Sequence, residues 1–161
     1  SAASDVYKRQ LKNQSIGVAS AAGKAYIHSA GKTQDVSKVW SNLGEQDAFL
    51  ESMAASAQAV ADYFGDKILY INVMNNLSID CDCDAHPHDP EMKDIGILAS
   101  LDPVALDQAC LDLVHAVRPS EGNNSKPLIE RIKSRNGQHT VDHAERIGMG
   151  SKKYELVELQ L

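Results

Sequence analysis

The sequence has no apolar run near the roughly 20 residues that a membrane-spanning helix needs, and its longest, at residues 68–73, is interrupted by Asn72. Its three cysteines cannot form a fully paired disulfide framework, so a reducing cytoplasm is the expected location. Lysine and arginine number 16 against 22 acidic residues, which gives a net charge of −6. Phosphate neutralisation requires clustered basic side chains, so this charge argues against a nucleic-acid partner. The short apolar runs likewise argue against a membrane partner.

The remaining composition is that of a globular protein, with 43% hydrophobic and 24% charged residues in 161, enough for one domain. Residues 1–10 stand apart from this domain. The last six of them back-translate as GAT-GTG-TAT-AAG-AGA-CAG, which looks like the transposon end used in sequencing adapters. We interpret residues 1–10 as an artefactual tail from a metagenomic read. An ordinary polar N-terminus is the alternative. On the first interpretation residues 11–161 form a single α/β domain, the C-terminal portion of a longer protein.

Periodicity predicts the main elements of this domain. Residues 47–64 carry an apolar stripe at helical spacing, ended by Gly65. Residues 67–73 are nearly all apolar, which suits a strand buried on both faces of a parallel sheet, and residues 95–99 suggest a second short strand. Asp102 followed by proline predicts a helix start, with the helix running to about residue 117.

Weaker patterns complete the prediction. We expect a short strand at 15–20, a loop at 21–33, short helices at 127–134 and 141–147, and an edge strand at 154–161. Strands alternating with helices indicate an α/β fold with a partly parallel sheet and flanking helices, a fragment of a larger α/β domain. A truncated sheet would expose an edge or apolar surface, so a homo-oligomer is within expectation.

The densest chemistry lies directly after the first predicted strand. Nine residues hold two thiols, two imidazoles and three carboxylates, in the order Cys81-Asp82-Cys83-Asp84-Ala85-His86-Pro87-His88-Asp89. Loops beyond the carboxyl ends of parallel strands are where open α/β sheets bind ligands. Thiolate and imidazole suit zinc or iron, so the candidate metal ligands are Cys81, Cys83, His86 and His88. No second cysteine pair exists, which excludes a four-cysteine zinc or iron–sulfur site within the chain.

Two other interpretations of this segment remain open. It could be a solvated polar loop whose thiols lie against the sheet. It could also hold a redox-active disulfide between Cys81 and Cys83, although closing a bridge over one intervening residue strains it.

Further polar residues could bind a ligand, each with a plainer alternative. Asn75 is as well suited to a turn, and Lys24 to an exposed surface position. The candidate ligand-binding residues are Lys24, His28, Asn75, Asp82, Asp84 and Asp94.

Neither a phosphate-binding loop nor a Gly-x-Ser-x-Gly elbow is present, so no reaction is assigned and whether the protein is an enzyme stays open. His139 and His143 are four residues apart, a spacing that can bind zinc on one helix face. The signal is weak, because capping by Thr140 would leave His139 outside the helix. Cys110 falls on the apolar stripe of its predicted helix and is expected in the core.

Ordered motifs carry a family resemblance. They are Tyr-Ile-Asn-Val at residues 70–73, Cys-Asp-Cys at 81–83, Asp-Ile-Gly-Ile-Leu-Ala-Ser at 94–100 and Asp-Pro-Val-Ala-Leu-Asp-Gln-Ala at 102–109. Together with residues 17–29 and 148–157, they closely resemble the C-terminal half of proteins called domain of unknown function 362.

The resemblance implies no settled activity. Many members of the family are described as iron–sulfur proteins because of a ferredoxin-like insertion after the segment matching His28. This chain has no such cysteine run, and it has Val18 where members often have cysteine, so the ferredoxin role does not carry over. The Cys81-Asp82-Cys83 element does carry over.

We therefore expect a cytoplasmic α/β protein with a metal-binding or redox-linked site around Cys81 and Cys83, and an unknown small molecule or redox partner. The alternative is a non-catalytic ligand-binding or assembly domain in which the same loop is structural.

Overall fold

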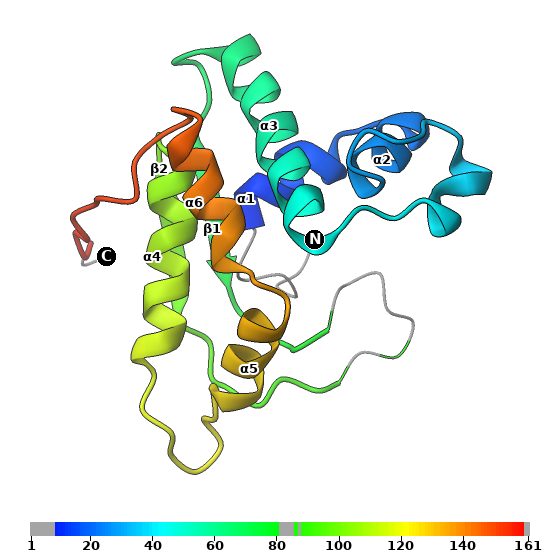
Figure 1. Cartoon of the computed structure of the whole chain (residues 1–161). Coiled ribbons are helices and arrows are strands. Elements are labelled where there is room, and N and C mark those ends of the chain that lie inside the picture. The colour runs from blue at the N-terminus through cyan, green and yellow to red at the C-terminus, as the bar shows by residue number, and fades with distance from the viewer. Residues whose placement is uncertain (1–8, 81–85, 87, 160–161) are drawn as a thin grey trace.

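The computed structural model describes residues 9–80, 86 and 88–159 of the chain. Helices dominate it, with one small sheet (Figure 1). In chain order the elements are α1 (Arg9–Lys12), the π-helix η2 (Asn13–Gly17), α2 (Ala21–His28), the 3-10 helix η3 (Val36–Ser41), α3 (Gln46–Phe64), β1 (Tyr70–Met74), β2 (Gly96–Ser100), α4 (Pro103–Ala116), α5 (Lys126–Ser134) and α6 (Gln138–Arg146).

The predicted long helix is confirmed as α3. Its apolar stripe places Leu50, Met53, Ala54 and Ala57 in the interior. Gly65 follows at φ 58°, a left-handed conformation that glycine adopts without a steric cost, and ends the helix. The other face of the helix is solvated, so α3 covers one side of the core and packs against α6.

The second predicted helix is confirmed as α4, including its cap. The Asp102 carboxylate Oδ1 accepts hydrogen bonds from the backbone N–H groups of Val104 at 2.8 Å and Ala105 at 3.1 Å. These bonds satisfy donors that lack a partner within the helix, and Pro103 has no N–H to satisfy. Most of α4 is buried and Cys110 lies in the core, as its position on the apolar stripe predicted.

The strands predicted at residues 67–73 and 95–99 form as β1 and β2, but the prediction of a partly parallel sheet is wrong. β1 and β2 are antiparallel, with Ile71 opposite Ala99 and Val73 opposite Ile97. Parallel neighbours need a crossover, usually a helix, and the described residues between these strands form none. Burial on both faces is also wrong, since alternate residues of β1 are exposed. A fold of mixed helices and strands is therefore correct, with an antiparallel pair as its sheet.

The N-terminal predictions are wrong at two places. No strand forms at 15–20: residues 15–17 belong to the π-helix η2, and residues 18–20 lie outside any helix or strand, because two alternating apolar residues are too few to decide between strand and helix. The loop expected at 21–33 contains α2, whose N-terminus is capped by Ser20 Oγ accepting from the N–H of Gly23 at 3.2 Å. Ala25 and Ile27 of α2 are buried, so packing stabilises a helix that its glycine content disfavours.

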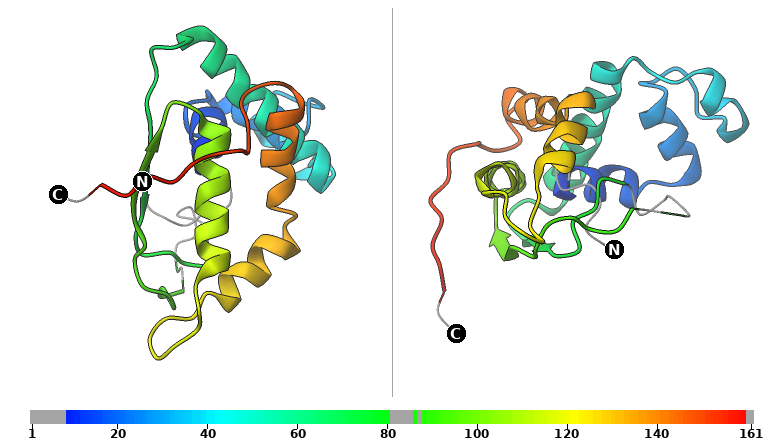
Figure 2. Two further views of the ribbon diagram at one scale, coloured as in Figure 1. Left: turned by 90° about the vertical axis from the view of Figure 1, so that its left-hand side faces the viewer. Right: turned by 90° about the horizontal axis from the view of Figure 1, so that it is seen from below.

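The C-terminal region confirms two short helices and contradicts one strand. α5 and α6 form where they were expected. Residues 154–159 belong to no strand. Ser151 N–H donates to Asp102 Oδ2 at 2.8 Å, and the Tyr154 hydroxyl donates to Asp112 Oδ2 at 2.8 Å. These bonds hold the start of the segment against α4, and it then runs out from the helices (Figure 2).

The main apolar cluster lies between α4, the inner face of the sheet and the helices α5 and α6, and its largest fully buried side chains include Leu11, Met74, Leu111 and Val141. A smaller apolar cluster lies between α2 and α3. Among the described residues, no helix is both long and apolar enough to cross a membrane.

Candidate functional site

The segment predicted to hold the chemistry is only partly described. Cys81, Asp82, Cys83 and Asp84 lie outside the described residues, so their assigned roles stay predictions. His86 is described and exposed, and His88 is described with its surroundings. The geometry of the candidate site therefore comes from His88 and from Asp80, the residue just before Cys81.

Asp80 and His88 join the two ends of the segment. The imidazole Nδ1 of His88 lies 2.5 Å from Asp80 Oδ2, and the same oxygen accepts from the His88 backbone N–H at 2.9 Å. Ser78 Oγ adds a hydrogen bond to the His88 carbonyl at 2.8 Å. Two side chains from the start of the loop thus fix both the backbone and the ring of His88.

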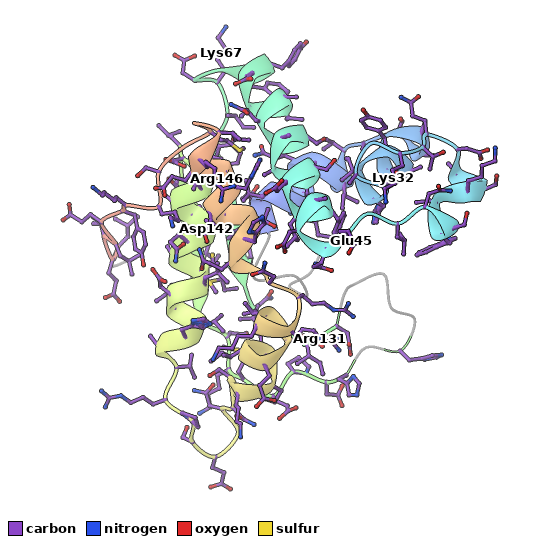
Figure 3. The ribbon with its side chains drawn as sticks, in the orientation of Figure 1. Lys32, Glu45, Lys67, Arg131, Asp142 and Arg146 are labelled. Carbon is purple, nitrogen blue, oxygen red and sulfur yellow. The ribbon has the colours of Figure 1, made fainter. Side chains whose placement is uncertain are left out.

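Arg131 on α5 supports this junction from outside the loop (Figure 3). Its guanidinium Nη2 lies 3.5 Å from Asp80 Oδ1, so one carboxylate oxygen faces the arginine and the other faces His88. The hydrogen bonds from the His88 backbone and ring hold the pKa of Asp80 below its usual value, with Arg131 adding to the effect and burial opposing it. Asp80 is therefore an ionised acceptor at neutral pH.

The Asp80–His88 pair is an arrangement that suits metal binding. Histidines that bind metals nearly always donate their second ring N–H to a carboxylate or carbonyl, which fixes the ring and the tautomer. With Nδ1 held by Asp80, a metal would be bound through Nε2. Among the described residues no group of three or more histidine, cysteine and acidic side chains could hold a metal ion. Any complete ligand set at this segment therefore has to include residues from 81–85.

The other predicted ligand-binding residues are not gathered at this site. Lys24 is exposed on α2, and His28 on the same helix stacks on Phe49 with ring centroids 5.1 Å apart. α2 packs against α3, η2 and η3, away from the sheet (Figure 1). Asn75 is half-buried at the end of β1, while Asp94 Oδ1 accepts from the Asn76 backbone N–H at 2.9 Å. Asp94 thus closes the turn after β1.

His139 and His143 lie on α6 and face the neighbouring helix α3. α6 begins at Gln138, so both residues are helical, and the prospect that Thr140 caps the helix is wrong. Both rings face Glu51 on α3, with His139 Nε2 at 3.0 Å and His143 Nδ1 at 3.3 Å from its Oε1. The hydrogen bond from His139 holds the pKa of Glu51 below its usual value, with His143 and Arg146 contributing. The two histidines therefore link α6 to α3.

A polar groove between α4, α6 and the C-terminal segment was not predicted. It is open, encloses about 510 Å³ and is lined by Gln108, Asp112, Gln138, Asp142 and Lys152. Lys152 Nζ donates to Asp142 Oδ1 at 2.8 Å, and Gln138 Nε2 donates to Gln108 Oε1 at 2.7 Å. The lining residues come from three separate stretches of sequence with no shared motif. Several of the lining polar groups form hydrogen bonds with one another, so their arrangement does not indicate which kind of ligand the groove would bind.

Comparison with known proteins gives one result. A family profile with the description Domain of unknown function (DUF362) matches residues 10–112, which include most of α1, α2, α3, both strands, the candidate segment and most of α4. No curated protein and no solved structure matches the chain.

Proposed function

The chain belongs to the family described as domain of unknown function 362, and from that premise we propose that the segment from Cys81 to His88 binds a transition metal, zinc or iron. The proposed ligands are the thiolates of Cys81 and Cys83 with His86 or His88. Membership of this family does not by itself indicate a metal or a reaction, because the family description names neither. The evidence for the metal site therefore comes from the residues of this chain.

The contact between Asp80 and His88 is the observation that carries the proposal. A carboxylate at 2.5 Å from Nδ1 orients the ring and increases the basicity of the imidazole as a ligand. The same carboxylate accepts the His88 backbone N–H, which brings the two ends of the segment together. The cysteine pair follows Asp80 directly in the sequence, so soft donors and an oriented imidazole belong to one short loop.

A metal held here would supply Lewis acidity, polarising a substrate or a bound water. In this proposal Asp80 and Arg131 are positioning residues: Asp80 orients His88, and Arg131 forms an ion pair with the other carboxylate oxygen of Asp80. Thiolate ligands require a reducing compartment, so we also propose that the protein is cytoplasmic.

One observation favours a second candidate function, a binding or assembly domain without a metal. Ser78, Asp80 and Arg131 fasten the loop through protein contacts, and a loop that presents a fixed surface to a partner would need the same bonds. The two functions differ in whether the cysteines bind metal.

The test is elemental analysis of protein purified anaerobically, together with titration of metal-free protein with Co²⁺ as a spectroscopic probe. We expect about one metal per chain and thiolate-to-cobalt charge-transfer absorption. Both should be lost in Cys81→Ser combined with Cys83→Ser, while the far-UV circular dichroism spectrum is kept.

Two further variants sharpen the test. Cys110→Ala removes the third thiol, which is buried on α4, and should leave metal content and the cobalt spectrum unchanged. Asp80→Asn should weaken metal affinity by roughly 10- to 100-fold, the usual cost of losing the carboxylate behind a histidine ligand. Folded wild-type protein that contains no metal and gives no cobalt spectrum would exclude the metal site and leave the binding domain.

A further inference from the structure

The sheet has an edge that no described strand covers. β2 pairs with β1 along one side and lies on α4, and within the described residues no strand pairs with its other side. The main chain of β1 is already contacted from α1, because Gln10 Nε2 donates to the Ile71 carbonyl at 2.9 Å. β2 carries neither charge nor proline, the features that protect edge strands from pairing with other chains. As far as the described residues show, the edge of β2 is thus open to an added strand.

The face of the sheet turned away from α4 is apolar as well. Because directly opposed residues point to the same side, Ile71 and Ala99 share a face with Val73 and Ile97. Ile71 is 52% exposed and Ile97 is 70% exposed. An added strand with apolar side chains would extend this face and shield part of it.

The C-terminal segment, residues 154–159, has the alternating sequence pattern of a β-strand but pairs with no strand of the sheet. Its apolar side chains are largely exposed, with Leu156 at 56%, Val157 at 68% and Leu159 at 79%. In a strand, Tyr154 and Leu156 would point to one side, and Val157 and Leu159 to the other. Either face of such a strand would therefore bring apolar side chains to a sheet.

We propose that two copies of this chain exchange these elements, each adding its C-terminal segment, residues 154–159, to the edge of β2 in the other. One chain carries both the open edge and the unpaired segment, so a second copy satisfies both at once. Reciprocal exchange about a two-fold axis closes the assembly as a dimer. The recognition is β-augmentation, with main-chain hydrogen bonds supplying affinity and alternate side chains supplying the fit.

The start of the segment is held on α4. Ser151 is bonded to Asp102 at the start of α4, and Tyr154 to Asp112 further along the same helix. Beyond Tyr154 the segment leaves the body of the protein in both views of Figure 2. This path places it for contact with another copy. The proposal is independent of the metal site.

Sedimentation velocity of the full chain over a range of concentrations tests the proposal. We expect a monomer–dimer equilibrium. The added segment would be an edge strand, in which successive backbone N–H groups point alternately toward β2 and away from it. Leu156→Pro combined with Val157→Pro therefore removes one donor to β2 in either register and should shift the dimer dissociation constant upward by at least tenfold. Tyr63→Ala, which removes an aromatic side chain that is 84% exposed on α3, is the matched control and should leave the equilibrium unchanged. A chain that stays monomeric at all concentrations overturns the proposal, as does equal loss of dimer in both variants.

A second measurement identifies the surface. A chain shortened to end at Lys153 keeps the edge of β2, and the described part of what it loses, residues 154–159, forms no helix or strand. It should be monomeric and should bind a fluorescent peptide of residues 153–161 with saturable anisotropy, while the same peptide with Leu156→Pro and Val157→Pro together should not bind. Peptide binding combined with a full chain that is a monomer would show that the segment returns to its own sheet, which overturns the exchange.

Discussion

Asp102 and Ser151 connect the start of α4 to the C-terminal segment. Asp102 Oδ2 accepts the Ser151 backbone N–H at 2.8 Å, while Oδ1 of the same carboxylate caps α4 through Val104 and Ala105. One side chain therefore fixes the first turn of the most buried helix and positions residues that lie 49 positions later in the chain.

Asp102→Ala removes all three hydrogen bonds, so it should destabilise the protein. Loss of an N-cap costs about 0.5–2 kcal/mol, and a further hydrogen bond to a charged group adds about 1 kcal/mol or more. We expect the midpoint urea concentration of unfolding to fall accordingly. The slope of the unfolding free energy against urea concentration (the m-value) should stay unchanged. Asp66→Ala removes an exposed carboxylate near the end of α3 and should leave the midpoint unchanged. An equal effect of the two substitutions would show that the cap contributes nothing.

Gly150 should tolerate no side chain while Asp102 is present. A Cβ added at residue 150 would overlap the Asp102 carboxylate, and overpacking of this kind costs about 1–3 kcal/mol. Gly150→Ala should therefore lower the free energy of unfolding, and it should cost much less in a chain that already carries Asp102→Ala. The double-mutant cycle measures this coupling. Strict additivity would mean that the two residues do not meet.

Local sequence patterns predicted the helices from α3 onward well, but they missed α2 and gave the wrong strand pairing, for a physical reason. The cap at Asp102, the glycine after α3 and the apolar stripes are all set by neighbours within one or two turns. Pairing of β1 with β2 depends instead on what connects them. The parallel prediction needed a crossover helix, which the described part of the connection lacks.

The candidate site shows the same limit. The cysteines and histidines of residues 81–88 are visible in the sequence as a cluster, and Asp80 stands beside it. Nothing local indicates that Asp80 holds His88, or that Arg131, 51 positions further on, contacts Asp80. For the same reason the sequence showed His139 and His143 as a pair but not their shared partner Glu51, which lies on a different helix.

Glu51 should make the protein sensitive to acid. Its pKa in the folded state lies below the usual 4.5, chiefly because of the hydrogen bond from His139. A carboxyl group with a lowered pKa stabilises the fold above its unfolded pKa, and this contribution is lost as pH falls through the folded value. Glu51→Gln should therefore destabilise the protein at neutral pH and have a much smaller effect below the folded pKa.

Urea unfolding of wild type and Glu51→Gln across this pH range measures the difference. Glu121→Gln, an exposed carboxylate in the loop before α5, should give a difference close to zero at every pH. A Glu51→Gln difference that does not change with pH would contradict the linkage and indicate that packing of α3 on α6 alone holds the two helices.

Asn72 should be among the least replaceable polar residues, because it links three elements inside the protein. It is 2% exposed, and its Nδ2 lies 3.2 Å from Asp107 Oδ1 and 3.2 Å from Cys110 Sγ, both on α4. Its Oδ1 accepts from Gln10 Nε2 at 2.8 Å, which brings in α1. Asp107 is fully buried and also accepts the Leu11 backbone N–H at 3.1 Å. Asn72 thus supplies one of the donors that stabilise a buried carboxylate.

Asn72→Ala should lower the free energy of unfolding by about 1–3 kcal/mol, because it removes one hydrogen bond to a buried carboxylate, which keeps those from the backbone of Gln10 and Leu11. Asn72→Asp should cost more, because it replaces a donor by a second carboxylate beside Asp107. The exposed amide Gln34→Ala is the control and should be neutral. Urea unfolding gives all three values. If Asn72→Asp proved as stable as Asn72→Ala, the amide would not be serving as a donor to Asp107, and the ordering of α1 against β1 and α4 would need another cause.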